Sequence, residues 1–444
     1  MAAVDIIDVK EPYAPYPGVV VPAASGDGAS DDTAAIQGKI DHMNFWGDQR
    51  TLVFPPGRYR TTAKITHRAR VVCRGIGYPF VAAEEIDTTT HAAVIHANHT
   101  GTAWEIDGPH CGLEGMVFST ATAAAQDVVS VYVAEGGTSS WIDRCAFWRR
   151  GRASLAVRAA RCRVTNCVIT TDPATTGPRG VLLPDGSPTG VGLWMQAAAD
   201  GWVENCEISS TGPGMWVKDG TASSFIDLKL FNSSIGLLLW RAERCSFEAL
   251  RVDENDHEGV VLDWGTSGNQ FTGLVYSNGT RVAAPASRKV GLRIGSGSYN
   301  RFDMIFSNWD HPDVNKPGID VMSPQQHGVW IEPLGTPSWT RLPPQHNRIE
   351  ATYRGQRSAP IVDNGDATNK LYSIGDGIAT PAAVQPAPAP EAQARSAGVA
   401  GPVAAAAAAG LLAFRNRRRG VPPPAVAPRR GSGGSGDPGG HLGA

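Results

Sequence analysis

Two short apolar patterns alternate along residues 100–355 of the chain. In the first, a small residue is followed by an apolar residue, any residue and a second apolar residue. In the second, usually about 10 to 12 residues later, an apolar residue is followed by two others, an apolar residue, any residue and an apolar residue. The first pattern occurs as SVYV (130–133), SLAV (154–157), GLWM (192–195), GMWV (214–217), GLLL (236–239), GVVL (259–262), GLRI (291–294) and GVWI (328–331). The second occurs as LEGMVF (113–118), IDRCAF (142–147), VTNCVI (164–169), VENCEI (203–208), FIDLKL (225–230), FEALRV (247–252) and FTGLVY (271–276).

The second pattern gives the length of the repeat. Val203, Phe225 and Phe247 recur every 22 residues. A repeat of that length, with short strands and no amphipathic helix, is typical of a parallel β-helix in which each repeat forms one coil. Stacked coils lie about 4.8 Å apart, so each pattern position forms a column along the solenoid. The sequence therefore predicts an all-β fold, a right-handed single-stranded parallel β-helix of about 9–11 coils.

Cysteines support this register. The chain has seven cysteines and no Cys-x-x-Cys pair, so we expect small buried thiols rather than a metal site or a disulfide framework. Six of them occupy two positions relative to the second pattern. The position three residues after the first apolar residue holds Cys145, Cys167 and Cys206, and the position two residues before it holds Cys111, Cys162 and Cys245.

Asparagines continue the same columns. The column of Cys245 goes on through Asn269, Asn300 and Asn347, which predicts buried amides that bond to their own stacked copies. A tight turn with a left-handed backbone is predicted at a second column, which contains Gly115, Asn166, Asn205 and Gly273.

The stretch GDGASDDTAAIQ (26–37) carries three aspartates and looks at first like a loop for a cation or a phosphate. An apolar helical face follows it directly and ends before Gly47, which predicts a short capping helix. We therefore expect Asp27, Asp31 and Asp32 to cap this helix and to bond turn amides rather than to carry chemistry.

The same segment resembles a known family. GDGASDDTAAIQGKID, followed by LVFPPGRYR and RGIGY, is similar to the N-terminal signature of the pectate-lyase-like superfamily, and the repeats extend the resemblance to about residue 355. The resemblance implies polygalacturonase- or rhamnogalacturonase-like enzymes, lyases or phage tail-spike depolymerases. For a tail-spike-like protein it also implies a homotrimer, the usual assembly of phage tail components. It implies the reaction only broadly, because one scaffold carries many reactions. The Asn-Thr-Asp, Asp-Asp and Gly-His-Gly segments of polygalacturonase-like enzymes do not occur within the coils.

Composition divides the chain into an N-terminal arm (1–17), a cap with the first coils (18–90), the β-helix (91–375) and a disordered tail rich in Ala, Pro and Gly (376–444). Within the tail, residues 396–414 precede RNRRR and form either a weak membrane span or a solvated Ala-rich stretch, and their few strongly apolar residues favour the second interpretation. The formal net charge of −2 argues against nucleic acid and anionic membranes as partners. The start MAAVDIIDVKEPY predicts no secretory signal peptide, so an extracellular or virion-associated protein would use another route.

Tryptophans mark one outward face. The middle residue of the first pattern must point outward if its flanks point inward. Indoles exposed in a row stack on sugar rings, so this face is expected to bind an extended polysaccharide, unless a loop or a neighbouring subunit covers it. The candidate binding residues in this column or just after its strands are Trp194, Trp216, Trp240, Arg241, Trp264, Arg293 and Trp330.

Charged residues beside this face are the candidates for catalysis. Asp219 and Asp263, placed two coils apart, would be separated by about 9.6 Å, near the upper end of the range for inverting glycoside hydrolysis. A lyase would instead need Lys218, Arg241 or Arg293 as a base near a carboxylate-bound cation, with Ca²⁺ as the candidate; otherwise we expect no cofactor and no metal. The full candidate set is Lys218, Asp219, Asp253, Asp256, His257 and Asp263. A further acidic column is interpreted as a solvated edge and contains Glu114, Asp143, Glu204, Glu248, Asp303 and Glu350.

These observations lead to two hypotheses. The first is a carbohydrate-active β-helix protein that binds and possibly cleaves an extended polysaccharide, as a component of a phage or prophage tail and as a homotrimer. The second is a non-catalytic structural or adhesive β-helix whose acidic residues only keep the surface solvated.

Overall fold

The computed structural model describes residues 6–45, 50–68, 70–77, 80–82, 85–86, 91–120, 129–148, 152–170, 189–279, 289–307, 325–333, 344–354, 360–365 and 367–373. Contacts divide the chain into residues 1–384 and 385–444, and every described residue belongs to the first unit. The predicted tail (376–444) and its membrane segment (396–414) lie outside the described residues. Among the described residues, no helix has the length and apolar character needed to span a membrane.

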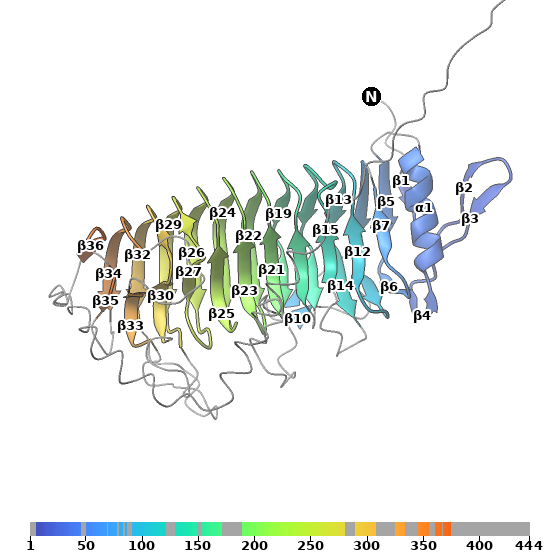
Figure 1. Cartoon of the computed structure of the whole chain (residues 1–444). Coiled ribbons are helices and arrows are strands. Elements are labelled where there is room, and N and C mark those ends of the chain that lie inside the picture. The colour runs from blue at the N-terminus through green and yellow to red at the C-terminus, as the bar shows by residue number, and fades with distance from the viewer. Residues whose placement is uncertain are drawn as a thin grey trace, which may run out of the picture. The chain divides into compact units, whose positions relative to one another are not determined.

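Two long parallel sheets run side by side through the described part of the chain (Figure 1). One sheet has 11 strands, one for each coil, so the predicted parallel β-helix of about 9–11 coils is confirmed. These strands are β7 (Ile65–His67), β12 (Thr102–Ile106), β15 (Val129–Val133), β18 (Ala153–Val157), β21 (Val191–Gln196), β23 (Pro213–Lys218), β25 (Ile235–Trp240), β27 (Val260–Asp263), β30 (Val290–Ile294), β33 (His327–Ile331) and β35 (Ile361–Asp363).

The second sheet has 19 strands and carries the second apolar pattern. It contains β1 (Ile6–Asp8), β4 (Asp27–Asp31), β5 (Arg50–Phe54), β6 (Gly57–Thr61), β8 (Val71–Gly75), β11 (Ala93–Ala97), β13 (Gly112–Glu114), β14 (Met116–Thr120), β16 (Trp141–Asp143), β17 (Ala146–Trp148), β19 (Arg163–Thr165), β20 (Val168–Thr170), β22 (Trp202–Ser209), β24 (Ser224–Phe231), β26 (Ser246–Asp253), β29 (Gln270–Tyr276), β32 (Arg301–Ser307), β34 (Arg348–Arg354) and β36 (Lys370–Ser373). Short two-stranded sheets are formed by β2 (Tyr13–Tyr16) with β3 (Val19–Val21), β9 (Phe80–Ala82) with β10 (Glu85–Ile86), and β28 (Thr266–Ser267) with β31 (Gly297–Ser298).

The strand register confirms the 22-residue repeat. Val203 pairs with Phe225, and Phe225 pairs with Phe247. From Phe225 onward the column is phenylalanine on four coils, with ring centroids 4.5 Å apart for Phe225–Phe247, 4.7 Å for Phe247–Phe271 and 4.5 Å for Phe271–Phe302. Because identical rings recur at the coil spacing, they stack face to face inside the solenoid.

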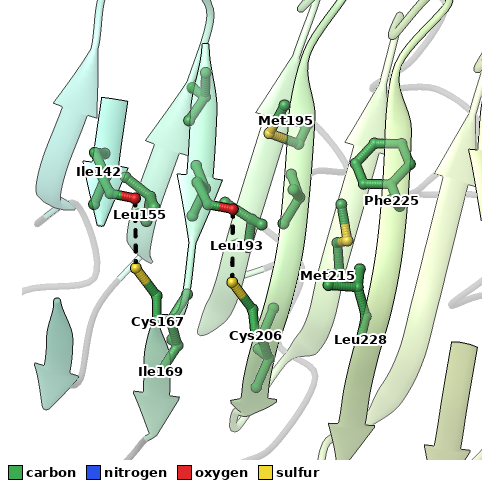
Figure 2. Packing of buried hydrophobic residues seen from close by; sticks show 14 of the residues in the cluster. Ile142, Leu155, Cys167, Ile169, Leu193, Met195, Cys206, Met215, Phe225 and Leu228 are labelled. Carbon is green, nitrogen blue, oxygen red and sulfur yellow. Dashed lines mark hydrogen bonds between the residues drawn. The ribbon is translucent and has the colours of Figure 1, made fainter. Parts of the chain in front are cut away.

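The cysteines line the core as predicted. All seven are buried and form no disulfide. Figure 2 shows Cys167 and Cys206 on adjacent coils between leucine, isoleucine and methionine side chains. The Cys167 thiol lies 3.8 Å from the backbone oxygen of Ile142. Burial raises the pKa of Cys145 to about 12, so such a thiol stays protonated and unreactive in the folded state.

The predicted asparagine ladder is present. The side-chain amide of Asn269 donates to Asn300 Oδ1 at 2.9 Å, and that of Asn300 donates to Asn347 Oδ1 at 3.0 Å. Asn347 in turn bonds Asn369 at 3.2 Å. Each carbonyl oxygen also accepts from the backbone amide of the residue one coil before it, so these buried amides bind neighbouring coils together.

The predicted left-handed turns also occur. Gly115, Asn166 and Asn205 have φ values of 62°, 54° and 50°. On the next coils the same turn is made by Asp227 and Ala249, with φ values of 49° and 53°. The turn therefore recurs at each of these coils even where the residue is not asparagine or glycine. The prediction is wrong for Gly273, which has a φ of 148° and pairs with Leu250 instead of Ala249 because the register shifts there.

The predicted capping helix is α1 (Thr33–Phe45), at the N-terminal end of the coils (Figure 1). All three aspartates bond to nearby amides, but the expected capping is only partly right. The Asp32 carbonyl accepts from the Ile36 amide at 3.0 Å and begins the helix. Its carboxylate instead accepts from the amides of Ser25 and Gly26 at 2.6 and 3.1 Å, so the side chain fixes the preceding loop.

Candidate functional site

The outer face of the 11-stranded sheet carries columns of aligned residues. Lys218 pairs with Trp240, which pairs with Asp263. On the next two coils, Leu262 pairs with Ile294 and Ile294 with Ile331, so the following residues Gly295 and Glu332 continue the column of Asp263. We call Asp263, Gly295 and Glu332 the acid column.

The predicted pair of Asp219 and Asp263 does not share a column. Asp219, Arg241 and Trp264 each lie one residue beyond that column, at a left-handed turn with φ values of 57°, 50° and 57°. Arg241 binds the Asp219 carboxylate with two nitrogens, Nε at 2.5 Å from Oδ1 and Nη2 at 2.8 Å from Oδ2. The side chains of Arg241 and Asp219 are 50% and 35% exposed, so this is a surface ion pair between coils, and Asp219 is offset by one residue from the column of Asp263.

The expected row of exposed indoles is wrong for its first two members. Trp216 is fully buried and Trp194 is 6% exposed. Their rings stack at 4.9 Å, and Trp240 packs edge-on against Trp216 at 4.9 Å. Large apolar side chains on adjacent coils contact one another and the neighbouring columns, and this forms a second apolar cluster outside the main core. Trp240, Trp264 and Trp330 remain half-buried.

Two cations lie over the buried indoles. The Arg152 guanidinium is 4.9 Å from the Trp194 ring, and Lys218 Nζ is 5.3 Å from the Trp216 ring. Such contacts hold a cation at the surface of an aromatic cluster. Lys218 lies in line with the acid column, two coils before Asp263, and Trp240 occupies the coil between them.

Asp253, Asp256 and His257 lie before β27, whereas Asp263 is its last residue. Asp253 ends β26 in the other sheet and accepts a hydrogen bond from the Tyr276 hydroxyl. Burial raises its pKa, with a weaker opposing effect of that hydrogen bond. Asp256 is buried and His257 is half-buried. These three predicted residues thus belong to the connection between the two sheets.

The structure instead groups carboxylates around Arg293, the fourth of the five residues of β30. Arg293 Nε lies 3.1 Å from Glu258 Oε1, and Nη1 lies 3.5 Å from Glu332 Oε1. Glu258 is fully buried, and the side chains of Arg293 and Glu332 are 25% and 20% exposed. Burial raises the pKa of Asp263, although the hydrogen bond that it accepts from the Trp264 backbone amide and the nearby positive charge of Arg293 act in the opposite direction. We call Glu258, Asp263, Arg293 and Glu332 the Arg293 cluster.

Gly295 separates the two carboxylates of the acid column. A Cβ at this position would lie 3.3 Å from Asp263 Oδ1, a close contact. With no side chain there, the coil between Asp263 and Glu332 leaves space beside the first carboxylate. The two residues stand two coils apart, which corresponds to about 9.6 Å between their Cα atoms.

Aromatic rings flank the cluster. Trp330 pairs with Arg293 on the neighbouring coil and packs against His327 at 5.3 Å. On the other side, the Trp264 amide donates to Asp263 Oδ1 at 2.9 Å, and the Trp264 ring lies 5.4 Å from that of Trp240. An acid with a raised pKa and a second carboxylate beside a guanidinium are groups suited to proton transfer next to flat apolar surfaces.

Among the described residues, no group of three or more His, Cys, Asp or Glu side chains is arranged to hold a metal ion. The carboxylates of the Arg293 cluster are instead placed around a guanidinium.

A model of the family described as rhamnogalacturonase A/epimerase, pectate lyase-like, matches residues 22–261, which is more than half of the chain. The chain belongs to this family. The match includes α1 and the strands that carry Trp194, Trp216 and Trp240, and it ends two residues before Asp263, so the acid column and Arg293 lie outside the matched residues.

Solved structures with the same fold are distant in sequence. The A-module of a mannuronan C-5 epimerase from Azotobacter vinelandii is 15% identical, with a TM-score of 0.54, over 80% of this chain and 98% of that one. DFA-IIIase from Arthrobacter chlorophenolicus A6, without its lid and in complex with GF2, is 11% identical, with a TM-score of 0.59, over 83% and 94%. Tailspike protein 2 of the Escherichia coli O157:H7 bacteriophage CAB120 is 10% identical, with a TM-score of 0.52, over 79% and 43%. No curated protein sequence matches the chain.

Sequence reasoning missed Glu258, Gly295 and Glu332 in this pectate-lyase-like chain. The signal was available for two of them, because GLRI is followed by Gly295 and GVWI by Glu332, at the position of Asp263 after GVVL. Aligning the residue that directly follows each copy of the first pattern identifies Gly295 and Glu332, whereas choosing the nearest charged residues does not. Glu258 precedes its strand, and only the contact with Arg293 distinguishes it from other acidic loop residues.

Proposed function

We propose that this pectate-lyase-like protein binds an extended polysaccharide along the outer face of the 11-stranded sheet and hydrolyses it with Asp263 and Glu332. The observation that carries the proposal is the acid column: two carboxylates aligned two coils apart, with a glycine between them. The half-buried rings of Trp240, Trp264 and Trp330 beside this column are surfaces on which sugar rings can stack.

The two carboxyl groups suit different roles. Because burial raises the pKa of Asp263, its carboxyl group holds a proton to higher pH and can donate it to the leaving glycosidic oxygen. Glu332, whose Oε1 lies 3.5 Å from Arg293 Nη1, is the second carboxylate of the acid column and takes the role of accepting a proton from a water molecule. A separation of about 9.6 Å between coils is near the range of about 6.5–9.5 Å found for inverting enzymes, in which that water lies between the carboxyl groups.

Arg293 is the proposed positioning residue. Its guanidinium bridges buried Glu258 and half-buried Glu332, which come from different coils. A fully buried carboxylate needs such a partner, since an uncompensated buried charge is strongly unfavourable. The ion pair with Glu258 therefore fixes the guanidinium that orients Glu332.

The comparisons support a carbohydrate-active protein without identifying its substrate. The similar epimerase acts on mannuronan and the similar DFA-IIIase was solved with GF2, while two of the similar structures are tailspike proteins. We further propose that the protein is a virion-associated, trimeric component of a phage or prophage tail. Its similarity to the two tailspike structures supports this proposal. A molar mass of three times 46.9 kDa in light scattering would support the trimer, and a monomer mass would contradict it.

A polysaccharide panel tests the proposal. Release of reducing ends without absorbance from unsaturated uronates is expected for hydrolysis, and both Asp263→Asn and Glu332→Gln should lower the rate about a hundredfold or more. Asp303→Asn is the matched control, because Asp303 is an exposed strand carboxylate in the other sheet. Unsaturated products would indicate a lyase. Binding without any cleavage would indicate the adhesive alternative.

A further inference from the structure

A second face of the solenoid carries aromatic and cationic residues in one column. Trp141, Arg163 and Trp202 pair with one another on three consecutive coils, at the first position of β16, β19 and β22. These strands belong to the 19-stranded sheet, so the column lies on a different sheet from the acid column. Trp202 is 39% exposed, Arg163 is exposed and Trp141 is half-buried. We call these three residues the Trp–Arg–Trp column.

Hydrogen bonds fix both indoles on the surface. Trp141 Nε1 donates to Glu114 Oε1 at 3.0 Å, and Trp202 Nε1 donates to Glu204 Oε2 at 2.9 Å. A Cβ at Gly112 would lie 2.5 Å from Trp141 Cε2, so the Trp141 ring lies directly over this glycine on the preceding coil. Indoles held in this way offer preorganised apolar surface to a ligand at little further cost in side-chain entropy.

The neighbouring acidic residues are engaged within the protein. Glu114 also pairs with Arg74 at 2.7 Å, and Asp143 accepts from the Thr165 hydroxyl at 2.7 Å and from Asn166 at 2.8 Å. The acidic column that the sequence suggested to be a solvated edge therefore binds its own coils together here. Arg163, in contrast, forms no ion pair and no side-chain hydrogen bond with any residue that the structure describes.

We propose that the Trp–Arg–Trp column is a second binding surface, separate from the Arg293 cluster, for an acidic polysaccharide. A free guanidinium binds a sugar carboxylate through two parallel N–H bonds, and an indole on each side stacks on the flanking rings. Contacts on successive coils recur about every 4.8 Å, so an extended chain can meet all three residues. The inference rests on the proposed function only in taking a polysaccharide as the ligand, and it names that ligand as uronate-containing.

Binding to defined polymers tests this surface. The probes are polygalacturonate, alginate and fully methyl-esterified polygalacturonate, and the full-length chain carries Asp263→Asn so that the polymers stay intact. Arg163→Gln should weaken binding to at least one polyuronate about tenfold and leave binding to the neutral ester unchanged. Trp202→Ala should weaken binding to polyuronate and ester alike, about fivefold. Near-UV circular dichroism checks that both variants keep the native fold.

Arg301→Gln is the matched control, because Arg301 is exposed in the same column but is flanked by Gln270 and Arg348 instead of tryptophans. It should change binding less than twofold. Equal effects of Arg163→Gln and Arg301→Gln, no effect of Trp202→Ala, or no binding to either polyuronate would overturn the proposal. If the wild-type protein cleaves no glycan while binding still depends on Arg163, hydrolysis at Asp263 and Glu332 fails and the second surface stands.

Discussion

Two columns on the same coils differ in composition and in bonding. Inside the solenoid, Asn269, Asn300 and Asn347 repeat one residue, and each amide bonds to the next copy. Outside it, the acid column places Asp263, Gly295 and Glu332 on coils of the same region, with no residue repeated. A residue repeated in a buried column forms hydrogen bonds with the backbone and with its copy on the next coil, so it holds the coils together. A column whose residue changes at every coil does not contribute to stacking in this way, and its residues are available for another role.

The largest effect is expected from breaking the inner column. Asn300→Ala removes the acceptor of two Asn269 donors and the donor to Thr266 and Asn347, all buried, so unfolding should need about 3–5 kcal/mol less free energy. Denaturant unfolding followed by circular dichroism measures the loss. Gln270→Ala, an exposed position beside the ladder, should change stability by less than about 0.5 kcal/mol. A small effect of Asn300→Ala would mean that the ladder contributes little.

Filling the outer column should affect activity and leave stability nearly unchanged. Gly295→Ala places a methyl group 3.3 Å from Asp263 Oδ1, beside the carboxyl group that is proposed to protonate the leaving oxygen. The rate on a cleavable glycan should fall about a hundredfold. An unchanged rate would remove Gly295 from the site, and a large loss of stability would show that the glycine is needed for folding instead.

The pH dependence of stability sharpens the contrast. Burial raises the pKa of Asp263 in the folded state, so the folded protein binds this proton more tightly than the unfolded chain does. The carboxyl group therefore costs no stability below its ordinary pKa of about 3.9 and becomes destabilising as the pH rises through the raised value. Asp263→Asn should consequently be more stable than the wild type at pH 7, with a gain that disappears toward pH 3. A gain that grew on acidification would contradict this order.

The smallest effect is expected at the exposed ion pair. Arg241→Gln removes the partner of Asp219 and should lower stability by less than about 1 kcal/mol, a difference that 1 M salt should abolish. Glu258→Gln, at the buried partner of Arg293, should cost several times more at either ionic strength. Denaturation at low and high salt compares the two, and equal losses would show that exposure does not decide the strength of these pairs.

The interior of the protein was predictable because every coil places the same pattern position in the same surroundings. The period read from Val203, Phe225 and Phe247 was enough to predict stacked strands, buried thiols and bonded asparagines. The outer face was less predictable for a physical reason: outward side chains are not always exposed, and Trp216 is buried among its neighbours. The register also becomes hard to follow in the last coils, where Gly295 and Glu332 are separated by long insertions in the repeat.

The buried thiols can report the order in which the coils of the solenoid unfold. The seven cysteines lie between Cys73 and Cys245, most of them one coil apart, and each is shielded as long as its coil stays closed. Because coils contact only their neighbours, unfolding in a solenoid can proceed from one end as a travelling front. Pulsed alkylation followed by mass spectrometry would record when each thiol becomes reactive, so the order of labelling would give the direction of that front, coil by coil, with the native cysteines as the only reporters.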